Sequence, residues 1–316
     1  MRACLSLVIG ILLSTTIVAH PGIGIVKDSK GFIYYTDLAN IYKFDPATQE
    51  SIIVVPHVHS HEIFIDKKDN LYGEHLWYAN SSTNRFDHYL WRLSPDGKLD
   101  TICGASNAFI DFNFSVVRDD NGNEYRVQPL TTDHILKKDK HGTITTLASG
   151  HFKNISWLQP LDDGRIYFTM HNSLYCLIAK DSIQKIVENV ANDPSDPGLY
   201  RIWRRSGSTD LYIACYSDGM VKKIDSSGAV TAVFIEHDRN WAPTGGVFDN
   251  EGRLWVMEIS KNNEVRVIRG VTRDNADNDS GTSLRSMLFA PPYGWFILTA
   301  ILCIFILFVL LKKYGQ

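Results

Sequence analysis

The chain has 316 residues, enough for one large domain or two ordinary ones. It carries a formal net charge of −3 with a pI near 6.4, which excludes a general electrostatic attraction to nucleic acid. Aromatic residues make up 11% of the chain, and glycine, aspartate and asparagine are spread along it. This composition is typical of many short strands joined by tight turns.

The N-terminus differs in character from the rest of the chain. Arg2 precedes a largely apolar run from Ala3 to Leu13, and small and polar residues then lead to Ala19. This order predicts a secretory signal peptide over residues 1–19, cleaved to leave His20 at the mature N-terminus. An uncleaved signal anchor is the alternative.

A repeated pattern fills residues 20–272. An apolar strand, a turn with Asp or Gly, and a strand with an aromatic residue recur, as in "GIVKDSKGFIYYTD" and "GVFDNEGRLWVME". The six copies begin at Gly24, Glu62, Ser115, Trp157, Ile202 and Gly246. Their spacing of about 40–50 residues matches the period of a propeller blade.

Each copy has a second half that reads strand, turn, strand, so each unit is predicted to be four antiparallel strands. Turns such as "SPDGKL" and "DSSGAV" supply the glycine that a tight hairpin needs. The sixth copy stops at "EVRVIRG", one strand short, and predicts a three-stranded blade. One blade cannot bury its faces alone, whereas six in a ring bury each face against a neighbour. The sequence therefore predicts an all-β fold, a six-bladed β-propeller. A β-sandwich with a separate domain would not explain six repeats.

The C-terminal segment changes character again. Residues 273–292 are mostly polar without apolar periodicity, which predicts a flexible stalk. The nineteen residues from Tyr293 to Leu311 carry no charge and are long enough to cross a bilayer as one transmembrane helix. Lys312 and Lys313 begin a short tail, residues 312–316, which is expected to stay in the cytoplasm. The bulk of the chain would then be extracytoplasmic, as a single-pass membrane protein.

The repeated units resemble the NHL-repeat propellers and, more loosely, the senescence-marker-protein/gluconolactonase group. The gluconolactonase resemblance implies a divalent cation held by Glu, Asn and Asp at the channel, near Glu62, Asn113 and Asn154. The amidating lyases, another NHL-type group, use histidine-bound zinc, which invites comparison with His20, His61 and His171. No local motif of either group recurs around these residues.

The stretch from His57 to Tyr78 holds four of the eleven histidines, together with Glu62 and Glu74. In such a blade, the segment leading into strand one and the loop between strands two and three lie on the same side of the disk. We expect His59, His61, His75 and His171 as candidate metal ligands there, for zinc or calcium. The alternative is that these side chains hydrogen-bond loop backbones and hold the mouth together.

Further residues should ring the same mouth and bind a ligand. They are His20, Asn113, Asn154, Trp157, Trp203, Tyr216 and Glu258. Arg201, Arg204 and Arg205 form a small basic group, which suits either an anionic ligand or a solvated rim.

The sequence supports two functions of different class. The first is a binding module whose His-rich channel mouth receives a small molecule or an extracytoplasmic protein. The alternative is a metal-dependent hydrolase or lyase, with a metal-bound water as nucleophile and Glu62 or Glu74 as catalytic base.

Overall fold

The computed structural model describes residues 22–80, 85–106, 117–128, 132–152, 155–192 and 198–270. The regular elements in these ranges are all β-strands, and no helix among them is long and apolar enough to cross a membrane. The predicted signal peptide, the stalk, the C-terminal helix and the tail lie outside the described residues, as do His20, Asn113 and Asn154.

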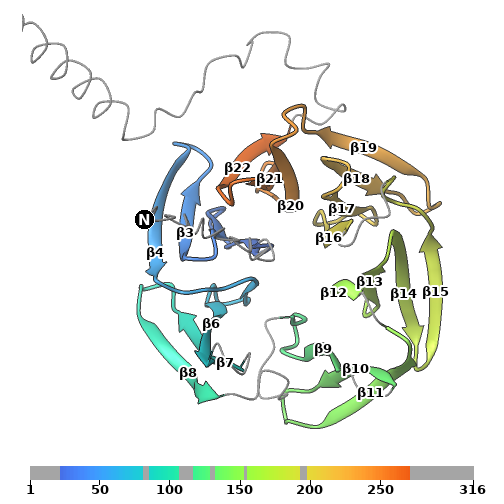
Figure 1. Cartoon of the computed structure of the whole chain (residues 1–316), viewed down its shortest axis with the longest axis horizontal. Helices are drawn as coiled ribbons and strands as arrows, with labels where there is room; N and C mark the ends of the chain where they lie inside the picture. The colour runs from blue at the N-terminus through green and yellow to red at the C-terminus, as the bar shows by residue number, and fades with distance from the viewer. Residues whose placement is uncertain are drawn as a thin grey trace, which may run out of the picture. The chain divides into compact units, whose positions relative to one another are not determined.

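The strands form six antiparallel sheets around a common centre, which confirms the six-bladed propeller (Figure 1). Blade 1 holds β1 (Ile25–Lys27), β2 (Ile33–Thr36), β3 (Asn40–Asp45) and β4 (Glu50–Pro56). Blade 2 holds β5 (Ile63–Ile65), β6 (Leu71–Asn80), β7 (Arg85–Leu93) and β8 (Leu99–Ser106). Blade 4 holds β12 (Ile155–Pro160), β13 (Ile166–Met170), β14 (Ser173–Ala179) and β15 (Ser182–Val187). Blade 5 holds β16 (Leu199–Arg204), β17 (Leu211–Cys215), β18 (Met220–Ile224) and β19 (Val230–Ile235).

The other two blades have three named strands each. Blade 3 holds β9 (Glu124–Gln128), β10 (Asp133–Lys138) and β11 (Ile144–Gly150), with a single bridge between Arg118 and Glu124 on its inner side. Blade 6 holds β20 (Trp241–Phe248), β21 (Leu254–Ser260) and β22 (Val265–Gly270), so the three-stranded sixth blade is confirmed within the described residues.

The ring closes by packing of inner strands. Strand β1 packs against β5 of blade 2 and against β20 of blade 6, so the first and last blades meet. Ile25 of blade 1 shares a buried cluster with Trp255 and Met257 of blade 6. Burial of apolar faces between neighbouring blades is therefore what stabilises the ring.

A shared hydrogen bond explains the Asp and the aromatic residue of the repeat. The turn aspartate accepts backbone N–H groups two and four residues ahead, as Asp28 does from Lys30 and Phe32 at 3.0 and 2.9 Å. Its second oxygen accepts a hydrogen bond from an aromatic side chain six residues ahead. These pairs are Asp28–Tyr34, Asp66–Tyr72, Asp119–Tyr125 and Asp249–Trp255. The aspartate of the repeat therefore stabilises the turn and also attaches it to the second strand of the blade.

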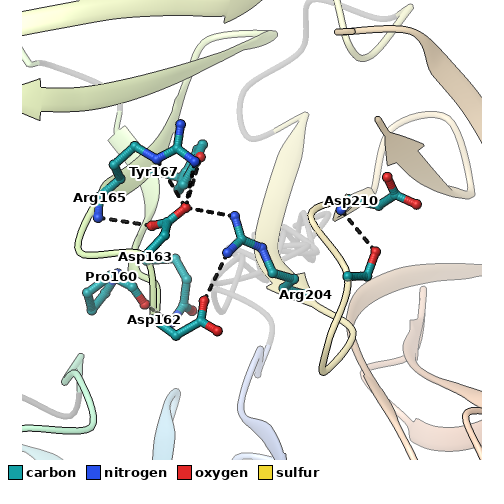
Figure 2. Close-up of polar contacts among 9 residues, drawn as sticks. Pro160, Asp162, Asp163, Arg165, Tyr167, Arg204 and Asp210 are labelled. Carbon is teal, nitrogen blue, oxygen red and sulfur yellow. Dashed lines mark hydrogen bonds and ion pairs between the residues drawn. The ribbon is translucent and has the colours of Figure 1, made fainter. Parts of the chain in front are cut away.

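In blade 4 the tyrosine is four residues after the aspartate, and Tyr167 donates to Asp163 Oδ2 at 3.5 Å. Blades 4 and 5 are also joined by an ionic connection. Arg204 at the end of β16 donates to Asp162 Oδ1 at 2.9 Å and to Asp163 Oδ2 at 3.0 Å (Figure 2). Asp163 also accepts from Arg165 Nε at 3.0 Å in its own turn. Arg204, one member of the basic group in the sequence, is therefore neutralised by the neighbouring blade.

Candidate functional site at the central channel

Three of the predicted metal ligands lie together in blade 2. His59 and His61 lie in the segment that precedes β5. Their rings pack edge to face, with centroids 4.7 Å apart. The backbone N–H of His59 donates to His75 Nδ1 at 2.9 Å. Because a backbone N–H can only donate, Nδ1 of His75 must be the unprotonated nitrogen, and Nε2 of the neutral ring carries the proton.

This arrangement favours the structural alternative for His75. Burial and the nearby His59 lower the pKa of His75, which keeps the ring neutral and the hydrogen bond intact. In this tautomer neither ring nitrogen offers a free lone pair to a metal. We infer that His75 holds the segment leading into β5 against β6.

The remaining metal candidates do not complete a centre. His171 is exposed, in a left-handed conformation with φ 55°, in the turn between β13 and β14. The described part of the chain holds no group of three His, Cys, Asp or Glu side chains placed to share a metal ion. The metal site therefore stays a prediction. Of the residues that the calcium comparison names, only Glu62 is described.

The two predicted catalytic residues lie near each other. Glu62 stands immediately before β5 and Glu74 lies in β6, both partly buried. Burial raises the pKa of Glu62 to about 7, although the Arg201 guanidinium opposes this shift. Burial and the Glu62 carboxylate raise the pKa of Glu74 to about 8. Near neutral pH this pair therefore holds protons that ordinary carboxyls would release.

Arg201 acts electrostatically on Glu62 from the far side of the ring. It lies in β16 of blade 5, which is opposite blade 2 in a ring of six (Figure 1). Its Nη1 donates to the carbonyl of Ile23 at 3.2 Å, and its guanidinium lies 5.3 Å from the centre of the Trp157 ring. Burial lowers the pKa of Arg201 to about 10, and the Glu62 charge opposes that shift. Residues of blades 1, 2, 4 and 5 thus converge on one guanidinium.

The predicted ligand-binding tryptophans have a packing role. Trp157 and Trp203 are both buried in the cluster that joins blades 4, 5 and 6. Trp157 Nε1 donates to Gln159 Oε1 at 3.2 Å. The Trp203 indole lies against Gly246, where an added Cβ would be 2.5 Å from Cζ2.

Glu258 lies in a second polar cluster, which the sequence did not reveal. It is fully buried in β21, and its Oε2 accepts from Arg266 Nε at 2.7 Å. Arg266 Nη2 also donates to Glu236 Oε2 at 2.6 Å, and its guanidinium stacks 4.1 Å from the centre of the Trp241 ring. Burial raises the pKa of Glu258 to about 8, against the influence of Arg266.

A pocket of ≈ 700 Å³ opens beside this cluster, among loops of blades 5 and 6. Its lining includes Tyr216, Glu236 and Trp241, so one predicted ligand-binding residue faces it. The Tyr216 ring is held edge to face against Tyr200, with centroids 5.3 Å apart.

The raised pKa values predict a pH dependence of stability. Between the ordinary glutamate value of 4.5 and the native values of about 7 and about 8, the folded protein binds more protons at Glu62 and Glu74 than the unfolded chain. The unfolding free energy should therefore fall as pH rises from about 5 to about 8. Urea unfolding of the wild type and of the Glu62→Gln/Glu74→Gln variant at pH 5, 6.5 and 8 checks this. The variant should show a flatter dependence, and identical slopes would contradict the raised values.

No protein-family model matches the chain, and no curated protein matches it. Among solved structures, an auxiliary nutrient binding protein from Bacteroides ovatus has 12% identity and a TM-score of 0.54, over 79% of this chain and 69% of that chain. A glucose dehydrogenase has 11% identity and a TM-score of 0.54, over 79% of this chain and 97% of that chain. A virginiamycin B lyase from Staphylococcus aureus has 14% identity and a TM-score of 0.41, over 78% of this chain and 83% of that chain. Such low identities show a shared fold and assign no chemistry.

Proposed function

We propose that the protein is a ligand-binding β-propeller of the NHL type, held outside the cytoplasm by a helix of residues 293–311. Its channel mouth would receive a small polar molecule or part of an extracytoplasmic protein. The observation that carries this proposal is the convergence of Glu62 and Glu74 of blade 2 with Arg201 of blade 5, all with shifted pKa values. Shifted groups that converge in a channel are typical of functional sites.

The chemistry of the pair indicates which ligand groups it would accept. A protonated carboxyl donates one hydrogen bond and still accepts others, so Glu62 and Glu74 together suit hydroxyl or amino groups. A bound amine would also favour the ionised form of both carboxyls and lower their pKa values. The histidines beside the pair shape the rim, with His75 held by the backbone of His59.

A hydrolase or lyase is the second candidate, and the raised pKa values favour it. A general acid or base works best when its pKa lies near the working pH, as at about 7 for Glu62 and about 8 for Glu74. One carboxyl would donate a proton to a leaving group while the other accepts a proton from water.

Thermal unfolding of the full-length chain against a panel of amines, sugars and lactones tests the binding proposal. We expect at least one compound to raise the Tm of the wild type and to lose this effect in Glu62→Gln/Glu74→Gln. The control is Glu251→Gln, which changes an exposed carboxylate on a strand-one-to-strand-two turn. A compound that stabilises all three proteins equally would contradict binding at the carboxyl pair.

The same samples separate binding from catalysis. Consumption of a stabilising lactone by the wild type alone would identify the hydrolase. Mass-spectrometric metal analysis of the wild type, His61→Ala and His75→Ala is an independent check. Stoichiometric metal that is lost in both variants would contradict the structural role assigned to His75.

A further inference from the structure

A cavity of ≈ 910 Å³ occupies the end of the channel where strands one and two of each blade are joined. Every blade contributes residues to its wall, including Lys27, Lys67, Asp120, Asp162 and Glu251. Several of these wall residues are exposed, so the cavity is open to solvent at this end. It lies on the side opposite to the histidine-bearing loops, and Arg201 is the residue that this cavity shares with the carboxyl pair of blade 2.

Many charges on the cavity wall neutralise one another. Lys67 pairs with Asp120 at 3.2 Å, and Arg118 pairs with Glu124 at 2.8 Å. Arg204 is neutralised by Asp162 and Asp163 (Figure 2). The remaining carboxylates Asp249 and Glu251 both pair with Arg253 at 2.6 and 2.8 Å. Asp119 is held by N–H groups of its own turn and by Tyr125.

Three cations on the wall have no such partner. Among the described residues, no carboxylate lies within 4.0 Å of Lys27, Arg201 or Arg205. Lys27 Nζ donates to the amide oxygen of Asn250 at 2.7 Å, which leaves its charge uncompensated. The Arg205 guanidinium lies over Gly252 at the rim, 5.8 Å from the centre of the Phe248 ring. The cavity therefore has an excess of positive charge.

Arg201 forms the inner end of this cavity. Its Nε is buried and has no hydrogen-bond partner among the described residues, and only Nη1 has one, the Ile23 carbonyl. Gly245 leaves room for the side chain, because a Cβ there would lie 3.2 Å from Arg201 Cδ. Burying a cation without a paired anion is costly, because the charge loses its hydration. Glu62 acts on this guanidinium only at longer range, since no ion pair within 4.0 Å joins the two among the described residues.

We propose that this turn-side cavity binds a small anion, whose carboxylate or phosphate group is held by Arg201 with Lys27 and Arg205. The planar guanidinium of Arg201 can pair with either group through two parallel hydrogen bonds. Lys27 and Arg205 hold the anion electrostatically from the outer part of the wall. The bound anion replaces the missing counter-ion of Arg201 and offsets the cost of its burial.

Isothermal titration calorimetry of the full-length chain with sodium succinate and with inorganic phosphate, at constant ionic strength, tests this. We expect saturable binding of at least one probe, and the probe that binds identifies the group as carboxylate or phosphate. Arg201→Gln should weaken binding about tenfold or more, a loss of about 1.4 kcal/mol. Arg205→Gln should weaken it about threefold because Arg205 is exposed. The control is Arg269→Gln, which removes an exposed arginine of β22 and should leave binding unchanged.

Two results would overturn the proposal. One is a wild type that binds neither probe, and the other is equal binding by the wild type, Arg201→Gln and Arg205→Gln. Thermal unfolding of each variant establishes that it is folded. If Arg201→Gln does not fold, the Arg205→Gln variant provides the test. A threefold loss of affinity in this variant supports the site, and an unchanged affinity refutes it.

Discussion

The Gly73→Ala variant should lose about 3 kcal/mol of unfolding free energy, at the upper end of what overpacking a core usually costs. An added Cβ at Gly73 would lie 2.2 Å from Trp91 Cζ2, far inside van der Waals contact. The Trp91 ring is only 1% exposed, and its Nε1 donates to the Glu74 carbonyl at 3.1 Å. The indole therefore cannot shift without breaking a buried hydrogen bond beside the carboxyl pair. Urea denaturation measures the loss.

Gly104→Ala is the matched control in the same blade. Gly104 lies in β8 with no atom within 4 Å of an added Cβ. Because alanine loses less backbone entropy than glycine on folding, this change should be neutral or stabilise by about 0.5–1 kcal/mol. Equal losses in the two variants would show that Gly73 is not constrained by Trp91.

The Arg266→Gln variant should lose about 3 kcal/mol at neutral pH, because it leaves two buried carboxyls without their cation. Arg266 contacts Glu236 and Glu258 at 2.6 and 2.7 Å, and the side chains of these two residues are 11% and 0% exposed. The same guanidinium covers the Trp241 ring, so both packing and charge are lost. Thermal or urea unfolding at pH 7 measures the effect.

The pH dependence of this loss identifies its cause. Because burial raises the pKa of Glu258 to about 8, this carboxyl is largely protonated below pH 7 and ionised at pH 9, so the loss should grow as pH rises through about 8. The control Arg269→Gln removes an exposed arginine from the same strand and should change the unfolding free energy by less than about 0.5 kcal/mol. A loss that does not depend on pH would assign the effect to packing against Trp241 alone.

The fold could be predicted from the sequence because each blade is specified by a short motif that recurs along the chain. An aspartate, a glycine turn and an aromatic residue six positions after the aspartate recur, and in four blades the structure joins that pair by a hydrogen bond. The three strands of blade 6 within the described residues agree with the shortened sixth repeat. Among the described residues, β1 packs on β20 and so brings the first and last blades together.

The candidate site was harder to predict from the sequence, because its contacts join residues of different blades. The expected placement of His59 and His75 on one face of the disk predicts a metal site, but the sequence does not show that a backbone N–H donates to His75 Nδ1. Glu62 directly precedes a predicted strand, and only the ring geometry brings the charge of Arg201 from blade 5 to act on it. The role of Arg266 could not be predicted from nearby residues, because its partners Glu236 and Glu258 lie in other segments.

Carbon-13 NMR of labelled glutamate side chains, titrated from pH 4 to 9, tests directly whether the channel holds a protonated carboxyl pair. The resonances that disappear in Glu62→Gln and in Glu74→Gln should have midpoints of about 7 and about 8 in the wild type. Arg201→Gln should move the Glu62 midpoint higher, because the guanidinium favours the ionised form. Midpoints near the ordinary value of 4.5 for both residues would show that the channel neither buries nor couples these carboxyls.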